Sequence, residues 1–210
     1  MESADGKSWQ ATTEPIQFPD GKTWKDYVRA TRMEMTCGEG PYLVSRYDTT
    51  TGEPIPLHQR IGLLDRKLRV IGENTESSGE WLEMAQEAYK NIYGFEWQGD
   101  NLLLAREALL TSFIEYYQAK FSKAPMQKSI KYIAYIISWN IWQMDGLKGV
   151  VPDSCHDVAP NSLFSDYEPS ELSPCPGCDK NKLYEHNGQY CVIMDWDKDE
   201  PIKFISLIKR

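Results

Sequence analysis

The segment Met33–Tyr42, with the sequence Met-Glu-Met-Thr-Cys-Gly-Glu-Gly-Pro-Tyr, most constrains the fold of this chain. Glu34 is followed by a Gly-x-Gly turn at Gly38 and Gly40, and then by an apolar run that can form a helix. Because glycine lacks a Cβ, these two positions allow a strand to turn sharply and allow backbone to approach a ligand closely. The segment therefore predicts a strand, a tight turn and a ligand beside the turn.

Two later segments extend this pattern. Ile92-Tyr-Gly-Phe-Glu-Trp97 ends in an acid and leads into a long helix, and Asn140-Ile-Trp-Gln-Met-Asp145-Gly146 also ends in an acid. A glycine turn and two acids, each at the end of a candidate strand, follow the order needed to hold a nucleoside across strand ends. The turn itself contains no basic residue and is not followed by Gly-Lys-Ser or Gly-Lys-Thr, which favours a nucleoside over a triphosphate. The alternative reading is that both acids are solvated strand ends.

The spacing of apolar residues alternates between two periods. Helical spacing predicts helices over residues 61–71, 77–92, 100–121 and 130–137. A short helix or strand is expected over 24–36 and a short helix over 42–47, and short apolar runs predict strands over 92–97 and 138–144. This alternation favours an α/β fold with parallel strands, and the alternative is an all-helical bundle. Composition changes after Pro152, which predicts an arm over 1–23, a main domain over 24–150 and a tail over 151–210.

Charge and hydropathy limit the partners of the chain. It has 210 residues, of which 23 are basic and 31 acidic, giving a formal net charge of −8. Tight binding to nucleic acid depends on basic contacts to phosphates, so we expect weak binding to DNA by this chain alone. A partner, a local basic patch or imitation of DNA all remain open. The polar N-terminus and the lack of a membrane-length apolar run predict a cytoplasmic protein with no membrane contact.

Four of the five cysteines lie after residue 150, where they indicate a zinc site. Cys175-Pro-Gly-Cys178 forms a tight knuckle, and a predicted hairpin places His186 and Cys191 on one face. Zinc needs four such ligands. The preferred set is Cys155, Cys175, Cys178 and Cys191, with His186 as the substitute for Cys155. The alternative is a group of reduced thiols without metal.

Three segments of the chain resemble motifs I, II and III of the S-adenosylmethionine-dependent adenine-N6 DNA methyltransferases of restriction–modification systems. Glu34-Met-Thr-Cys-Gly-Glu-Gly-Pro-Tyr-Leu43 is similar to that family's Glu-Pro-x-Cys-Gly-x-Gly-x-Phe-Leu motif. Tyr93-Gly-Phe-Glu96 and Met144-Asp145-Gly-Leu147 resemble its second and third motifs. The stretch from about Trp24 to Cys155 also resembles short proteins labelled restriction subunit M in bacterial and phage genomes.

The resemblance implies a Rossmann-like, class I methyltransferase-type domain that binds S-adenosylmethionine. It implies that Glu96 holds the ribose, that Trp97 packs on the adenine, and that Asp145 accepts from the adenine amine. The residues implied to line the methionine part of the cofactor are Glu34, Thr36, Gly38 and Gly40, and Cys37 is counted with them as cofactor-binding.

The chain departs from this family where catalysis would occur. The signature Asn/Asp/Ser-Pro-Pro-Tyr/Phe, which contacts a flipped adenine, occurs nowhere in the sequence. Only about 60 residues follow Asp145, too few for the usual remaining strands and a target-recognition domain, so the domain would be incomplete. We therefore expect a methyltransferase-like protein that is inactive alone and works with a partner subunit or as a homodimer. The alternative is an acidic, catalytically inactive inhibitor or accessory protein, such as a phage-borne one, that acts on a restriction or CRISPR nuclease.

Overall fold

The computed structural model describes residues 6, 10–12, 14–158 and 172–208. Its contacts divide the chain into two compact units, residues 1–142 and 143–210, and each unit buries apolar side chains of its own. Part of the predicted arm over 1–23 lies outside the described residues. Within the described ranges, no helix combines the length and apolar character needed to cross a membrane.

The first unit contains a three-stranded parallel sheet in the order β1-β2-β3. The strands are β1 (Arg32–Met35), β2 (Ile92–Glu96) and β3 (Ile141–Gln143). β1 and β2 pair in parallel, with Glu34 opposite Gly94. The predicted α/β class with parallel strands is confirmed, and the Rossmann-like methyltransferase fold remains a prediction.

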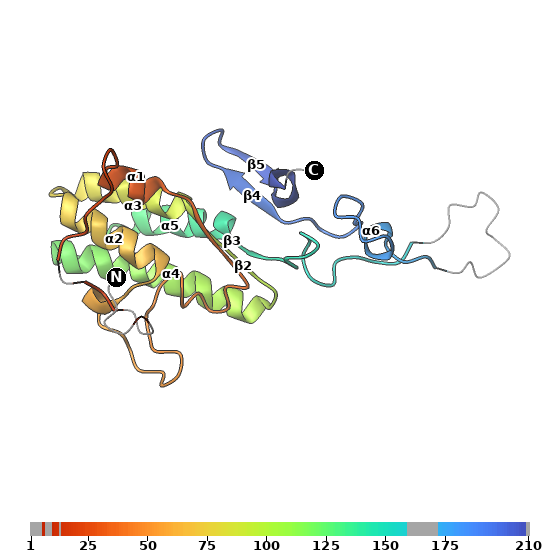
Figure 1. Cartoon of the computed structure of the whole chain (residues 1–210), viewed down its shortest axis with the longest axis horizontal. Helices are drawn as coiled ribbons and strands as arrows, with labels where there is room; N and C mark the ends of the chain where they lie inside the picture. Colours follow the sequence, from red (N-terminus) through yellow and green to blue (C-terminus); the bar gives the residue numbers. More distant parts are fainter. Residues whose placement is uncertain (1–5, 7–9, 13, 159–171, 209–210) are drawn as a thin grey trace. The chain divides into compact units, whose positions relative to one another are not determined.

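The helices of this unit gather beside these strands (Figure 1), and they are α1 (Trp24–Arg29), α2 (Leu63–Asn74), α3 (Ser78–Lys90), α4 (Gly99–Phe121) and α5 (Gln127–Asn140). In the contacts between elements, α4 packs against α2, α5 and β2, and α3 packs against α2, α5 and β2. The long helices therefore cover the sheet and one another.

Local signals explain where several elements begin and end. The hydroxyl of Ser77 accepts a hydrogen bond from the backbone N–H of Glu80, so α3 begins where its capping residues predict. Residues 42–47 form the end of a turn, irregular backbone and an isolated β-bridge at Tyr47 rather than the expected helix. The strand predicted over 138–144 is shorter because α5 continues to Asn140. The amide of Asn140 donates to the carbonyls of Tyr89, Lys90 and Ile92, which fixes the end of α5 against the start of β2.

A cluster of aromatic rings fills the core between α3 and α4. The ring of Trp81 lies 5.8 Å from that of Phe113 and 5.4 Å from that of Tyr117, the latter edge to face. Such rings bury large apolar areas and dominate core packing.

The buried ammonium of Lys67 donates to the carbonyls of Ala30 and Asn91, which precede β1 and β2. These contacts hold the starts of both strands against α2.

The segment between β1 and α2 is held to α4 by ion pairs. The guanidinium of Arg46 makes two hydrogen bonds to the carboxylate of Glu115, at 2.7 and 2.9 Å, and Arg60 contacts the same carboxylate at 2.5 Å. This segment includes a short 3-10 helix, η1 (Leu57–Gln59). Two arginines on one partly buried acid fix the segment beside the glycine turn.

The second unit is small and has little regular structure. Its elements are α6 (Pro176–Asp179), the antiparallel pair β4 (Val192–Asp195) and β5 (Glu200–Lys203), and the 3-10 helix η2 (Phe204–Leu207). The hairpin predicted around an Asn-Gly turn is a bend at Gly188, and the hairpin of this unit is formed by β4 and β5 instead. A domain with so few buried apolar residues gains much from a covalent or metal cross-link.

Candidate functional site

The glycine turn follows β1 directly. Thr36, Gly38 and Gly40 all have positive φ values, of 56°, 55° and 79°. A Cβ on Gly40 would lie 3.4 Å from the Cβ of Ala105 in α4, so the turn runs close to that helix. The backbone N–H of the buried Cys37 donates to the carbonyl of Phe95 in β2. The turn therefore lies at the carboxyl end of the parallel strands, where ligands bind in open α/β sheets.

Glu96 ends β2 and contacts this turn. Its carboxylate accepts hydrogen bonds from the backbone N–H of Gly38 at 2.8 Å and of Gln98 at 3.2 Å. The side chain is buried, whereas the neighbouring Trp97 is 46% exposed. Each carboxylate oxygen has a further lone pair. Glu96 can thus hold the turn in place and still accept a hydrogen bond from a ligand.

Glu34 lies at the edge of a cavity in the first unit. The cavity has a volume of about 680 Å³, and its other lining residues include Tyr42, Ser45 and Arg66. The Oε2 atom of Glu34 is buried and has no hydrogen-bond partner among the described residues. Burial raises the pKa of this carboxyl group to about 7. A cavity of this size suits a small ligand, and an unpartnered carboxylate oxygen favours one that carries a cationic hydrogen-bond donor.

Asp145 belongs to the second unit, where it organises a turn. Its Oδ1 accepts from the backbone N–H groups of Leu147 and Lys148. Its Oδ2 lies 3.6 Å from the ammonium nitrogen of Lys148. The side chain is buried. Its expected partnership with Glu96 around one ligand remains a prediction.

The second unit brings together three cysteines and one histidine. The ligand atoms of Cys155, Cys175, Cys178 and His186 all lie within 4.8 Å of one another. The Nδ1 atom of His186 lies 3.6, 3.8 and 3.6 Å from the sulfurs of Cys155, Cys175 and Cys178, respectively. Tetrahedral zinc with ordinary bond lengths would separate sulfur and nitrogen ligands by about 3.6 Å. The cluster could therefore hold a metal ion such as zinc.

Two glycines allow the four ligands to approach one another. A Cβ on Gly177 would lie 2.5 Å from the backbone nitrogen of His186, and a Cβ on Gly188 would lie 2.9 Å from the sulfur of Cys155. The backbone N–H of Asn187 donates to the sulfur of Cys175 at 3.3 Å. The ligands thus come from three separate stretches that close contacts bind together.

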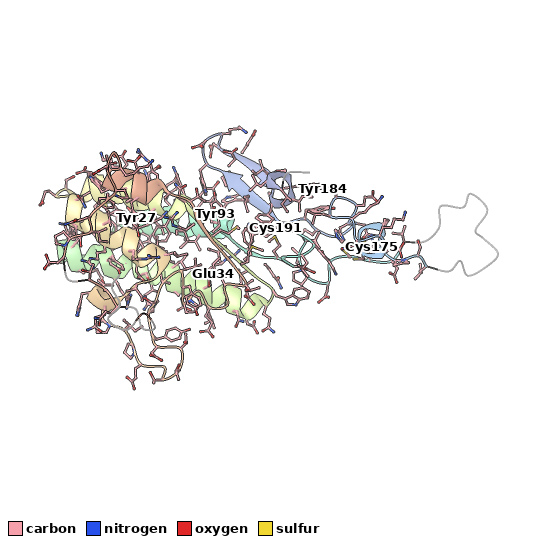
Figure 2. All side chains as sticks on the ribbon, in the orientation of Figure 1. Tyr27, Glu34, Tyr93, Cys175, Tyr184 and Cys191 are labelled. Carbon is pink, nitrogen blue, oxygen red and sulfur yellow. The ribbon has the colours of Figure 1, made fainter. Side chains whose placement is uncertain are left out.

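The fourth ligand differs from the preferred set. Cys191 lies immediately before β4, away from Cys175 beside α6 (Figure 2), and it is not part of the cluster. Burial raises the pKa of the Cys191 thiol to about 12, so it stays protonated. The cluster that could hold a metal ion contains His186 as well as Cys155. The sequence contained a signal for His186, because this residue lies only eight residues after Cys178.

Comparisons with known proteins found no match to this chain: no protein-family model, no curated protein and no solved structure. The observations that bear on function are therefore internal to the molecule. They are the glycine turn held by Glu96, the cavity beside Glu34, and the cluster of three cysteines and His186.

Proposed function

We propose that this chain is an S-adenosylmethionine-binding protein similar to the adenine-N6 DNA methyltransferases of restriction–modification systems, and that it needs a partner for methyl transfer. The main support is the cavity that Glu34 lines near the glycine turn, together with the Oε2 atom of this residue, which is buried without a partner among the described residues. The sequence resemblance is a second support, because the glycine turn, Glu96 and Asp145 follow one another along the chain in the order of the family's three motifs.

The methionine part of the cofactor carries an ammonium group, which suits the carboxylate of Glu34. A buried carboxylate without a partner is costly, and a nearby cation favours its charged form. Tyr42, which is 74% exposed, and Met33, which is 51% exposed, add apolar surface to the same cavity. The cavity thus sets the carboxylate of Glu34 beside apolar surface, as the methionine part requires, and Asp48 and Arg66 also line it.

Glu96 and Trp97 would serve the nucleoside. The carboxylate of Glu96 is already oriented by Gly38 and Gln98, so a ribose hydroxyl could donate to a fixed acceptor. Trp97 is the next residue and is partly exposed, which suits packing on a base. When bound, the cofactor would supply the methyl group. The chain's own residues would bind and orient it.

The metal cluster would hold one zinc ion as a structural element. Four protein ligands close the coordination sphere, which leaves no position for a reacting water. Metal binding to such a site stabilises the folded state directly. The ion would thus link α6 to the segments that carry Cys155 and His186.

Calorimetric titration of the full chain with S-adenosylhomocysteine and S-adenosylmethionine tests the cofactor proposal. We expect one site per chain, and at a hundredfold excess over Kd the ligand should stabilise the fold by about 2.7 kcal/mol. Glu34→Gln and Glu96→Gln should weaken binding. Glu83→Gln, an exposed acid on α3, is the matched control and should leave it unchanged. Absence of heat and of a melting shift at millimolar ligand would refute cofactor binding.

A further inference from the structure

The basic residues of this acidic chain are unevenly distributed. Residues 116–144 contain four of the 23 basic residues and none of the 31 acidic residues. This stretch covers the end of α4, the connection to α5, and α5 itself. A local positive region therefore exists on a protein whose formal net charge is −8.

Helix α5 has two sides of opposite character. Its buried side carries three isoleucines, at positions 133, 136 and 137, which pack into the core. At 100° per residue, five other side chains share a face that lies about 130° around the helix axis from these isoleucines. We call this surface the α5 outer face, and its residues are Lys128, Lys131, Tyr132, Tyr135 and Trp139.

The aromatic rings of the α5 outer face form a continuous row. Tyr132 is 37% exposed and Tyr135 is 45% exposed. Their ring centroids lie 6.2 Å apart with an interplanar angle of 20°, and the ring of Tyr135 meets that of Trp139 at 6.4 Å and 78°. Neighbouring rings that touch along a helix restrict one another, so the row is a prearranged platform.

The lysines beside this platform keep their charge available. Lys123, Lys128 and Lys131 are exposed, and among the described residues no acid lies within ion-pair distance of any of them. Lys120 instead donates to the carbonyl of Gly72 and is tied to α2. The α5 outer face thus sets two uncompensated ammonium groups, those of Lys128 and Lys131, beside a row of rings.

We propose that the α5 outer face binds single-stranded nucleic acid. Proteins that bind single strands combine basic groups along the phosphates with aromatic rings on which bases stack. Duplex DNA keeps its bases stacked on one another, so it can use the lysines but not the rings. An anionic membrane would require a wide aliphatic face, and three of the four isoleucines of α5 are buried in the core. This proposal goes beyond the proposed function and does not depend on cofactor binding.

Fluorescence anisotropy with a labelled single-stranded oligonucleotide of mixed sequence tests this proposal on the full chain. We expect binding that weakens with salt. The double variant Lys128→Glu/Lys131→Glu should lower affinity at least tenfold and reduce the salt slope by about 0.7 for each phosphate that the protein no longer neutralises. Tyr135→Ala should weaken binding on the order of tenfold without changing the salt slope, because it removes stacking rather than charge.

The matched control is Lys22→Glu/Lys25→Glu, which makes the same change in net charge at exposed positions around the start of α1. It should retain most of the affinity. Equal losses in both double variants would show that only overall charge matters and would overturn the proposal. Equal binding of duplex and single strand, or binding to anionic lipid vesicles but not to the oligonucleotide, would also overturn it. Circular dichroism checks each variant for folding, and the cofactor titration reports separately on the first unit.

Discussion

The carboxylate of Glu96 accepts a hydrogen bond from the backbone N–H of Gly38 at 2.8 Å, although 58 residues separate the two along the chain. The bond joins the end of β2 to the turn that follows β1. A carboxylate held by backbone donors is a charge-assisted and well-oriented acceptor. The two features that the sequence singled out for cofactor binding therefore lie in direct contact within the first unit.

The affinity for the cofactor should depend on pH through Glu34. Burial raises the pKa of this carboxyl group to about 7, so below that pH it is protonated and does not attract an ammonium group. We expect binding to tighten between pH 6 and pH 8 in the wild type. In Glu34→Gln binding should be weaker and nearly independent of pH. Calorimetric titrations across this range measure the effect, and equal pH profiles for the two proteins would contradict it.

Glu34 should also make the free energy of unfolding depend on pH. Its pKa is raised from 4.5 to about 7 on folding, so between these pH values the native state binds a proton that the unfolded state has released. Stability contributed by the neutral group is therefore lost as the pH rises through about 7. The free energy of unfolding of Glu34→Gln, relative to wild type, should increase from pH 5 to pH 8. Urea unfolding at the two pH values measures it.

Zinc content should separate His186 from Cys191. Elemental analysis of wild type purified without added metal should give one zinc per chain. His186→Ala should lose the ion, because it removes one of four ligands, whereas Cys191→Ala should keep it, since Cys191 lies outside the cluster. His186→Cys restores a fourth ligand and should recover the ion. Loss of zinc in Cys191→Ala with retention in His186→Ala would reverse the assignment.

Adding a methyl group at Gly94 should destabilise the first unit. A Cβ there would lie 2.9 Å from Leu43, and 3.2 Å from both Cys37 and Ile141. Overpacking of this kind typically costs about 1–3 kcal/mol, so Gly94→Ala should lower Tm. Gly72→Ala makes the same chemical change in α2, where no atom lies within 4 Å of the new Cβ. It should stabilise the helix by up to about 1 kcal/mol.

The chain alone should not methylate duplex DNA measurably. It lacks the Asn/Asp/Ser-Pro-Pro-Tyr/Phe tetrapeptide, which would contact the target amine and stack on a flipped base. Unstacking that base costs a few kcal/mol, and no substitute for this motif is apparent in the sequence. Transfer of labelled methyl groups to adenine by the pure protein, abolished by Asp145→Ala, would contradict this expectation. Activity that appears only on mixing with a partner subunit would agree with it.

Local signals predicted much of the first unit. Helical spacing placed α2, α3 and α5 near their observed positions, and the apolar run from Ile92 identified β2. These features depend on residues close together in the chain, so periodicity and capping suffice. The prediction of the end of α5 was less accurate. This end depends on the amide of Asn140, which donates to carbonyls around the start of β2, about 50 residues away along the chain.

The sequence by itself determined the residue types available to each site: a glycine turn with two acids, a cysteine knuckle with nearby histidine, and a stretch of lysines without acids. Only the tertiary structure decided which of them act together. It selected His186 rather than Cys191, left Oε2 of Glu34 buried without a partner, and turned Tyr135 outward on α5. The physical reason is that ligand geometry and burial arise from segments distant in the chain, and no local pattern encodes how those segments meet.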